Sequence, residues 1–352
     1  MVWLRLNLSN STRNFSSQTL FDITQRVIGA MGAPIPSATA VAQSLVLSNL
    51  VGHDSHGIIR VVEYSGWVEQ GHLIPAAQPK IAFEKEATAE IDGNWGWGQT
   101  ASYLATEKLV DLTKQYGTAT VVLKRTNHVG RLGEYVDLMA TAGLMGIAFC
   151  NTGGPIVAPF GGYKRVMGTN PFAWALPGSG EFNYVLDFST AIVAAGKIIL
   201  AGMSGEELPP GLLLDKDGNF TTNADDLTNG GSLLTFGGHK GSGISVLIDL
   251  AAGILSGNMP AAISDSGYGN GTVLIGVDVS RFASLALFQS VGKEFELIMQ
   301  NAGTPNSVLM PGEYEYKTLT ERNKSGITLT QGVIANILEV ADRYQVKIPE
   351  FD

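Results

Sequence analysis

A chain of 352 residues, 45% of them hydrophobic and 16% charged, is long enough for two hydrophobic cores and too apolar for a disordered protein. Its formal net charge of −9 and its lack of any basic run argue against a nucleic-acid partner, because phosphate binding needs clustered Lys and Arg. The longest apolar tract, residues 244–255, contains Asp249 and is shorter than the roughly 20 residues that span a bilayer, so we expect no membrane partner.

The compartment is predicted from the first residues and from the cysteine content. The start, MVWLRLNLSN, contains an Arg and no sustained apolar run, so it does not resemble a secretory signal. Cys150 is the single cysteine and cannot form an intramolecular disulfide. Its apolar neighbours predict a buried thiol in a strand. These features favour a cytoplasmic protein in a reducing compartment.

The N-terminal 80 residues have a helical pattern. Apolar residues recur at helical spacing over residues 19–31, which predicts an amphipathic helix. A second helix is expected after Pro36, with Ser37 as its N-cap and Gly52 at its end. This part of the chain is therefore predicted to be helical.

After Pro79 short β-prone runs alternate with helical stretches. Strands are expected at residues 80–83, 118–123, 146–150, 172–176 and 272–279. Helices are expected at residues 100–116, 133–142 and 331–344. Helices that alternate with strands predict an α/β sheet domain.

The first cluster of residues that could carry chemistry is HDSHG at 53–57, followed by Arg60 and Tyr64. If this segment continues as one helix, His56, Arg60 and Tyr64 fall at i, i+4 and i+8 on one face. An Arg can bind a carboxylate through two parallel hydrogen bonds, and a His can exchange a proton with the adjacent oxygen. The alternative, that the polar residues cap a helix and the histidines fill a turn, stays open on the residues alone.

The second cluster, residues 126–131, directly follows the expected strand that ends at Leu123 and contains His128. Ligands of α/β proteins gather beyond the carboxyl ends of strands, so this position favours a functional histidine. A solvent-exposed loop histidine is an equally good interpretation of the residues alone.

The third cluster is GGHKGSG at 237–243, which leads into an apolar helix. Backbone amides at a helix N-terminus bind anions, and Lys240 adds a full positive charge, so a pyrophosphate or ribose-phosphate is a natural guest. The spacing matches neither the P-loop nor the GxGxxG pattern. The alternative is a tight structural turn, which explains the glycines but not His239 and Lys240.

The fourth cluster combines GTNP at 168–171 with LDFS at 186–189. An Asn-Pro step fixes an extended or turn conformation, so its first interpretation is architectural. Asp187 ends a β-like run and could accept hydrogen bonds from a cofactor hydroxyl. Capping of the next helix is the alternative for this carboxylate.

Taken in order, GHDSHGIIRV, NHVGRLGEY, PFGG, GTNPFA, LDFST with AAGK, and GGHKGSGISVLIDLAAGILSG resemble the type 2 malate/L-lactate dehydrogenase family. The blocks keep the family's order from about residue 20 to the PGE at 311–313 and so cover nearly the whole chain. Within the family the motifs look like the hydroxycarboxylate dehydrogenase B subgroup, whereas Arg60 and Tyr64 look like ureidoglycolate dehydrogenase.

The resemblance implies a non-Rossmann α/β fold. It has a helical domain built from both chain ends, residues 1–80 with 315–352, and a mixed-sheet domain at 81–314 that binds NAD(P) and carries catalysis. It also implies a homodimer with the active site near the interface, a small 2-oxo or 2-hydroxy acid as substrate, NAD or NADP as cofactor, and no metal.

The same resemblance assigns roles to residues. The proton-transfer candidates are His128 and His56, with His128 favoured. The substrate-binding residues are Ser55, Arg60 and Tyr64. By position, Thr152, Asp187, Phe188, Ser189 and Lys240 match cofactor contacts. We also expect cofactor contacts at Thr169, Asn170, His239 and Glu313.

The predicted activity is the NAD(P)-dependent interconversion of a 2-oxo acid and its 2-hydroxy acid by hydride transfer. Two alternatives remain. One is an NAD(P)H-dependent reductase of a cyclic imine acid, which needs the same carboxylate contact but a C=N acceptor. The other is a catalytically silent nucleotide-binding protein, against which the presence of both histidines argues.

Overall fold

The computed structural model describes residues 11–205, 207–264, 268–304 and 307–348. The chain divides into two compact units, one of residues 1–77 with 312–352 and the other of residues 78–311. The first ten residues, on which the expectation about a secretory signal rests, lie outside the described part. In that part no helix is long and apolar enough to cross a membrane.

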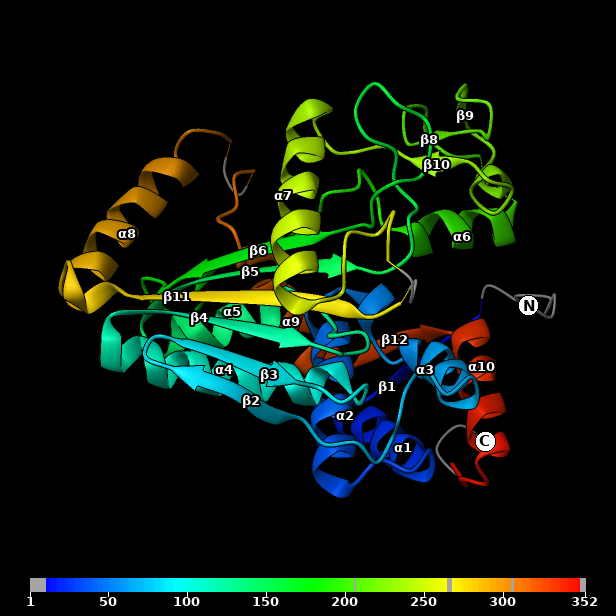
Figure 1. Cartoon of the computed structure of the whole chain (residues 1–352), viewed down its shortest axis with the longest axis horizontal. Coiled ribbons are helices and arrows are strands. Elements are labelled where there is room, and N and C mark those ends of the chain that lie inside the picture. The colour runs from blue at the N-terminus through cyan, green and yellow to red at the C-terminus, as the bar shows by residue number, and fades with distance from the viewer. Residues whose placement is uncertain (1–10, 206, 265–267, 305–306, 349–352) are drawn as a thin grey trace. The chain divides into compact units, whose positions relative to one another are not determined.

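The first unit is built from both ends of the chain, as expected. Strand β1 (Thr12–Phe15) pairs antiparallel with β12 (Ile327–Thr330), which joins the two termini. The helices of this unit are α1 (Ser17–Ala30), α2 (Ile35–Leu50), α3 (Arg60–Glu69), α9 (Glu313–Ser325) and α10 (Gln331–Arg343). Blue and red ribbons, from opposite ends of the chain, therefore lie together in Figure 1.

The second helix begins earlier than its sequence predicts. Pro36 lies in the first turn, where the amide that proline lacks would have no helical partner, so the helix starts at Ile35. Ser37 is fully buried inside the helix. The prediction that Ser37 is the N-cap is therefore wrong.

The second unit is organised around a seven-stranded mixed sheet in the order β2-β3-β4-β11-β5-β6-β7. These strands are β2 (Lys80–Lys85), β3 (Thr88–Asp92), β4 (Thr118–Lys124), β11 (Asn270–Asp278), β5 (Leu144–Thr152), β6 (Pro171–Leu176) and β7 (Tyr184–Ser189). Only β3 and β4 pair in parallel, and the other neighbours are antiparallel. The predicted mixed sheet is confirmed.

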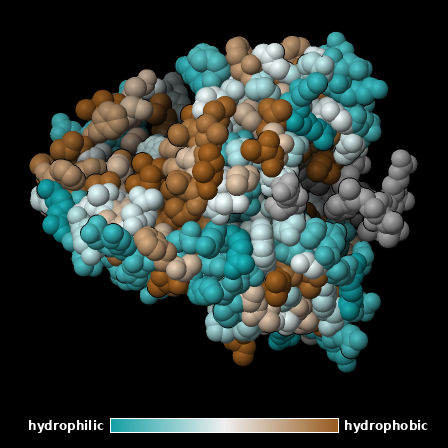
Figure 2. Space-filling view, in the orientation of Figure 1, coloured by the Kyte–Doolittle hydropathy of each residue, from teal (hydrophilic) through white to brown (hydrophobic). Residues whose placement is uncertain are grey.

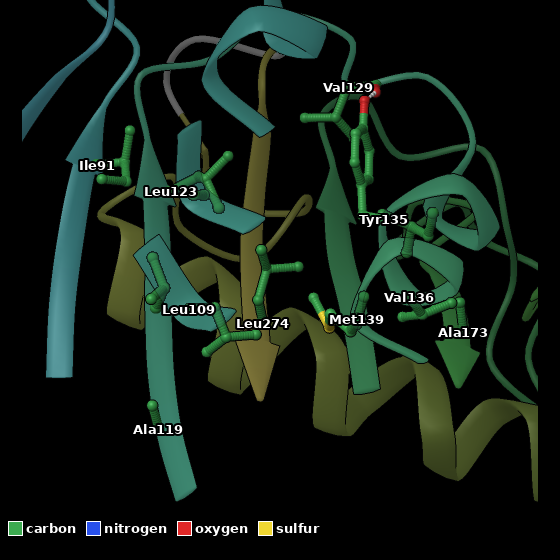
Figure 3. Packing of buried hydrophobic residues seen from close by; sticks show 14 of the residues in the cluster. Ile91, Leu109, Ala119, Leu123, Val129, Tyr135, Val136, Met139, Ala173 and Leu274 are labelled. Atoms are coloured by element: carbon green, nitrogen blue, oxygen red, sulfur yellow. Dashed lines mark hydrogen bonds between the residues drawn. The ribbon is translucent and has the colours of Figure 1, made fainter. Parts of the chain in front are cut away.

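Helices cover both faces of this sheet. On one face α4 (Gly98–Tyr116) and α5 (Leu132–Thr141) bury a core that includes Leu109, Leu123, Met139 and Leu274, and Figure 3 shows these side chains meeting. On the other face α7 (His239–Ser256) packs Ile248 against β5 and β11. Alternating burial along β4 follows from this arrangement, because successive strand residues point to opposite faces.

The rest of the second unit flanks the large sheet. A small sheet contains β8 (Leu213–Leu214), β9 (Phe220–Thr221) and β10 (Ser232–Leu233), and it lies with α6 (Ala195–Ser204) and the 3₁₀ turn η2 (Ala224–Leu227) around a core of its own. After β11, the 3₁₀ turn η3 (Val279–Arg281) leads into α8 (Leu285–Gln300), which Figure 1 shows in orange.

Candidate functional site

Several of the expected site segments converge on one edge of the large sheet. Strands β4 and β5 are both antiparallel to β11, so they run in the same direction and end at the same edge. Strand β6 begins at this edge and β7 ends there, because each is antiparallel to its neighbour. The topology therefore brings together the loop at 125–131, the end of β5 at Thr152, the 168–170 segment and the end of β7 at Ser189.

The loop that carries His128 is held on both sides. The side-chain amide of Asn127 donates to the carbonyl of Trp95 over 2.8 Å. On the other side of the histidine, the backbone amide of Val129 donates to Oδ1 of Asn270 over 3.1 Å. The histidine itself is half-buried. Two fixed neighbours thus leave little freedom to the backbone that presents the imidazole.

Asp187 and Phe188 point to opposite faces of the sheet. Asp187 lies opposite Ala173 of β6, a core residue on the face covered by α5. Its Oδ2 accepts a 2.6 Å hydrogen bond from the backbone amide of Gly133, in the first turn of α5. Phe188 contacts Phe236, just before the 237–243 segment, edge to face, with ring centroids 5.1 Å apart. Asp187 therefore caps α5, a helix that precedes it in the chain.

The hydroxyl and amide side chains at 152, 169, 170 and 189 form one connected group. Asn170 has a positive φ of 35°, a conformation that asparagine tolerates better than most residues. Its Oδ1 accepts from the backbone amide of Thr152 at 3.2 Å, and its Nδ2 donates to Ser245 on α7 at 3.0 Å. Ser189 donates to the carbonyl of Thr169 at 2.8 Å. The structure thus brings four of the expected cofactor residues into contact.

A buried polar network behind this group was not identified from the sequence. Asn151 is fully buried, and its Nδ2 donates to Oδ1 of Asp249 on α7 over 2.6 Å. Its Oδ1 accepts from Asn258 over 2.7 Å. Burial raises the pKa of Asp249, while hydrogen bonds from Asn151 and Asn170 oppose that rise. The available signal was the single carboxylate in the apolar stretch 244–255.

The 237–243 segment forms the N-terminus of α7, as its glycines predict. Gly237 and Gly238 both have positive φ values, 55° and 62°, which side chains rarely adopt. The side chains of His239 and Lys240 are exposed, and among the described residues Lys240 forms no ion pair. The positive end of an 18-residue helix therefore lies next to an unpaired cation.

The residues of the second unit fit a dinucleotide. Hydroxyl and amide groups at the strand ends suit ribose hydroxyls, and the start of α7 with Lys240 suits a pyrophosphate. A Cβ on Gly168 would overlap the side-chain oxygen of Thr152, so only glycine lets the chain pass that close. Within the described ranges no group of His, Cys, Asp or Glu is arranged to hold a metal ion.

The first unit contains the other predicted cluster, but not as one helix. Residues 54–56 form the 3₁₀ turn η1 (Asp54–His56), Gly57 is extended, and α3 begins only at Arg60. The side chain of Asn49 occupies the space beside Gly57 and accepts from the backbone amide of Ile58 at 2.9 Å, which interrupts the helix. The prediction that His56 shares a helical face with Arg60 is therefore wrong.

Other contacts fix the residues around His56. Ser55 Oγ lies 3.1 Å from His56 Nδ1. The backbone carbonyl of Ser55 accepts a 2.7 Å hydrogen bond from Nε of Arg60. Nη1 of the Arg60 guanidinium forms an ion pair with the carboxylate of Glu63. Tyr64, one helical turn further along, is only 1% exposed.

Glu313 belongs to a different unit of the chain from the other expected cofactor residues. It is the first residue of α9 in the first unit, is buried, and pairs with Lys317 at 2.7 Å. His56 likewise belongs to the first unit, whereas His128 belongs to the second.

Comparison with known proteins agrees with this architecture over almost the whole length. Residues 15–338 match the family model described as malate/L-lactate dehydrogenase. The chain belongs to this family. Hydroxycarboxylate dehydrogenase B of Escherichia coli (strain K12) is 34% identical over 349 residues, which cover 97% of this chain and 96% of the relative. Malate dehydrogenase of Pyrococcus abyssi is 32% identical over 344 residues, which cover 93% of this chain and 94% of that relative.

A solved structure shares the fold. The structure described as a putative malate/lactate dehydrogenase from E. coli superimposes with a TM-score of 0.90 at 32% identity, covering 96% of this chain and 98% of that one. This malate/L-lactate dehydrogenase family member is therefore an α/β protein of a family of NAD(P)-dependent dehydrogenases, as the six sequence blocks indicate.

Proposed function

We propose that this family member interconverts a small 2-oxo acid and its 2-hydroxy acid with NAD or NADP as cofactor. The observation that carries the proposal is the convergence, at one sheet edge, of a rigidly held His128 loop with the Thr152, Thr169, Asn170 and Ser189 group. A proton-transfer group beside a set of ribose-compatible donors is what such a reaction requires.

His128 is proposed to hold the proton that passes to and from the substrate oxygen. When bound, NAD(P)H supplies the hydride that the carbonyl carbon receives. In the reducing direction, negative charge develops on the carbonyl oxygen, and a protonated imidazole aimed at that oxygen stabilises the transition state more than the ground state. His56, whose Nδ1 lies beside the Ser55 hydroxyl, is the second proton-transfer candidate.

Ser55, Arg60 and Tyr64 are proposed to bind the substrate from the first unit. Arg60 reaches a ligand only by giving up the contacts that it already has, since its Nε bonds to the Ser55 carbonyl and its terminal nitrogen pairs with Glu63. Glu63 thus competes with a substrate carboxylate for this guanidinium. The affinity that Arg60 adds is reduced by the cost of breaking that pair.

The cofactor is proposed to lie along the sheet edge and the start of α7. Thr152, Thr169, Asn170, Asp187, Phe188 and Ser189 would contact it from the strand ends, His239 and Lys240 from the helix, and Glu313 from the first unit. Oδ2 of Asp187 already accepts from the backbone amide of Gly133, so a cofactor hydroxyl would share this carboxylate with the start of α5. The cytoplasm, where a single buried thiol such as Cys150 stays reduced, is the proposed compartment.

We also propose that the working assembly is a homodimer. Helix α8 has a burial pattern that is unusual for a monomer. It buries the charged side chain of Glu296 and exposes most of its apolar residues to solvent. Its exposed apolar residues are Leu285, Leu287, Val291, Phe295, Leu297, Ile298 and Met299. On α7, exposed leucine, isoleucine and valine side chains form a second apolar face, and Figure 2 shows both helices as brown areas. A second copy of the chain is the occupant that this proposal assigns to these faces.

A substrate screen tests the proposed reaction. Oxidation of NADH and of NADPH is followed by the loss of the reduced nicotinamide's absorbance at about 340 nm. The panel of 2-oxo acids includes pyruvate-like, aryl-pyruvate and dicarboxylic members. A cyclic imine acid is added to the panel. We expect turnover of at least one 2-oxo acid and none of the imine acid. Turnover of the imine acid alone would replace the proposal with imine reduction.

A further inference from the structure

Asn270 contacts the His128 loop on both sides of the histidine. It is the first residue of β11, and only 9% of it is exposed. Its backbone amide donates to the carbonyl of Thr126 over 2.9 Å, and its side-chain Oδ1 accepts from the amide of Val129 over 3.1 Å. The hydroxyl of Thr126 donates in turn to the carbonyl of Asn270. One residue therefore holds the loop both before and after His128.

The same residue is paired with the strand that carries expected cofactor contacts. Asn270 lies opposite Thr152 in the antiparallel ladder between β11 and β5. Its Nδ2 donates to the carbonyl of Gly269 over 3.0 Å, and that carbonyl also accepts from the amide of Gly153 over 3.0 Å. Asn270 thus joins the loop of His128 to the end of β5, two segments that the topology alone only brings to the same edge of the sheet.

The contacts before the histidine fix the loop from the other direction. The amide of Asn127 donates to the carbonyl of Trp95, whose own amide donates to the carbonyl of Arg125 over 2.7 Å. Trp95 has a positive φ of 59°, which is unusual for so bulky a residue. These contacts tie the loop to the segment after β3, on the side of β4 away from β5, so they set no distance to the cofactor strand.

The peptide between His128 and Val129 is where Asn270 acts. The side chain of Val129 lies in the core covered by α4 and α5, and its carbonyl accepts from the hydroxyl of Tyr135, as Figure 3 shows. The carbonyl of His128 lies so close to Gly98 that a Cβ there would come within 2.3 Å of it. Without Oδ1 of Asn270, the amide of this peptide is buried without its acceptor, and the plane that orients the histidine loses a restraint.

We propose that Asn270 is a positioning residue that holds His128 at the separation from the cofactor strand that proton transfer requires, an inference that rests on the proposed function. The reaction delivers a proton and a hydride to neighbouring atoms of one carbonyl group, so the two segments need a fixed separation. Asn270 acts through the amide of Val129. The sequence does not reveal this role, because Asn270 precedes the predicted strand at 272–279 and lies 141 positions from Val129.

Three variants test this role. Asn270→Ala removes the acceptor of the Val129 amide, and Asn270→Asp keeps an oxygen in its place. Asn183→Ala is the matched control, because Oδ1 of Asn183 also accepts from a backbone amide, that of Gly178, over 3.1 Å. Asn183 directly precedes β7, whose start lies at the opposite edge of the sheet. Both alanine variants leave a backbone amide without its acceptor, so a lower Tm in either does not decide between positioning and structure.

The kinetic constants separate the two roles. Each variant is assayed well below its Tm with the 2-oxo acid that wild type turns over best. We expect Asn270→Ala to lower kcat about 10- to 100-fold, with KM for the acid and the dissociation constant of NADH within about two-fold of wild type. Asn270→Asp should recover most of the lost kcat, and Asn183→Ala should keep kcat within about two-fold of wild type.

Three kinetic results would overturn the proposal. One is a kcat for Asn270→Ala within about two-fold of wild type. Another is an equal loss of kcat in Asn183→Ala, which would make the effect a general consequence of lower stability. The third is no recovery in Asn270→Asp, which would assign the loss to packing around the side chain and not to the acceptor.

A spectroscopic measurement follows His128 without turnover. The full-length protein is labelled with carbon-13 at Cε1 of its histidines, and the NMR signal of His128 is identified by its absence from His128→Ala. We expect one narrow signal in wild type and in Asn183→Ala, and a shifted or broadened one in Asn270→Ala, because an imidazole on a loosened backbone samples several environments. An unchanged signal in Asn270→Ala overturns the inference. The proposed function fails on the substrate screen alone, so the two failures are distinguishable.

Discussion

Replacing Asp249 tests whether the buried network behind the sheet edge stabilises the second unit. In Asp249→Leu, the side-chain amide nitrogen of Asn151 loses its acceptor while fully buried, and the side-chain nitrogen of Asn170 loses one of its acceptors but keeps Ser245. A buried donor left without an acceptor costs about 1 to 3 kcal/mol of folding free energy. Because the side-chain amide of Asn170 is also affected, we expect Asp249→Leu to lower the free energy of unfolding by about 2 to 4 kcal/mol. For a unit of this size that corresponds to a fall in Tm of roughly 5 to 15 °C.

The same prediction has a pH dependence with a definite sign. Burial raises the pKa of Asp249 above its ordinary value of 3.8, so the folded protein favours the protonated carboxyl more than the unfolded chain does. The stabilisation that Asp249 contributes to folding is complete below the pKa of the carboxyl in the unfolded chain. It is lost as the pH rises through the pKa of the carboxyl in the folded protein. The Tm difference between wild type and Asp249→Leu should therefore be larger at about pH 4 than at about pH 8.

The assay is thermal unfolding followed by circular dichroism, with two comparison variants. Asp249→Asn keeps an oxygen that can accept from Asn151 and should lose less than half as much stability as Asp249→Leu. Asp217→Leu removes an exposed carboxylate from the same unit and should change stability by no more than about 0.5 kcal/mol. A Tm for Asp249→Leu within about 2 °C of that of wild type would refute the reasoning.

Three further predictions concern the proposed function. Lys240→Ala should raise the dissociation constant for NAD(P)H about ten-fold or more, measured by fluorescence titration, and unchanged affinity would return the start of α7 to a purely structural turn. His56→Asn should lower kcat while cofactor affinity stays nearly constant, and a kcat above half of the wild-type value would remove it from the proton-transfer candidates. Phe295→Glu, at a position 54% exposed on α8, should convert a dimer to a monomer in light scattering after size exclusion, whereas monomeric wild type would contradict the proposed homodimer.

The local pattern of apolar residues was sufficient to predict many of the strands in the second unit. Alternating apolar residues place Ala119, Val121 and Leu123 on the buried face of β4, and a single strand register satisfies all of them. The expected strand at 146–150 proves to be the centre of the longer β5, because β11 continues the ladder on both ends, over residues 144–152. The mixed order of the strands was available only through the family resemblance, since periodicity carries no information on which strands pair.

Contacts between distant residues explain what the sequence did not reveal. The break at Gly57 depends on the side chain of Asn49, eight positions earlier, which no helical pattern shows. The capping of α5 by Asp187 joins residues 54 positions apart. Such features depend on packing and not on local propensity.

The most direct test of the proposed reaction follows the hydride itself. The protein is supplied with a 2-oxo acid and NADH carrying deuterium at C4, on each face in separate reactions, and the product is analysed by mass spectrometry and NMR. The proposal predicts a 2-hydroxy acid with deuterium on C2 from one of the two labelled cofactors, and loss of this product in His128→Ala. A product without deuterium from either cofactor would contradict it.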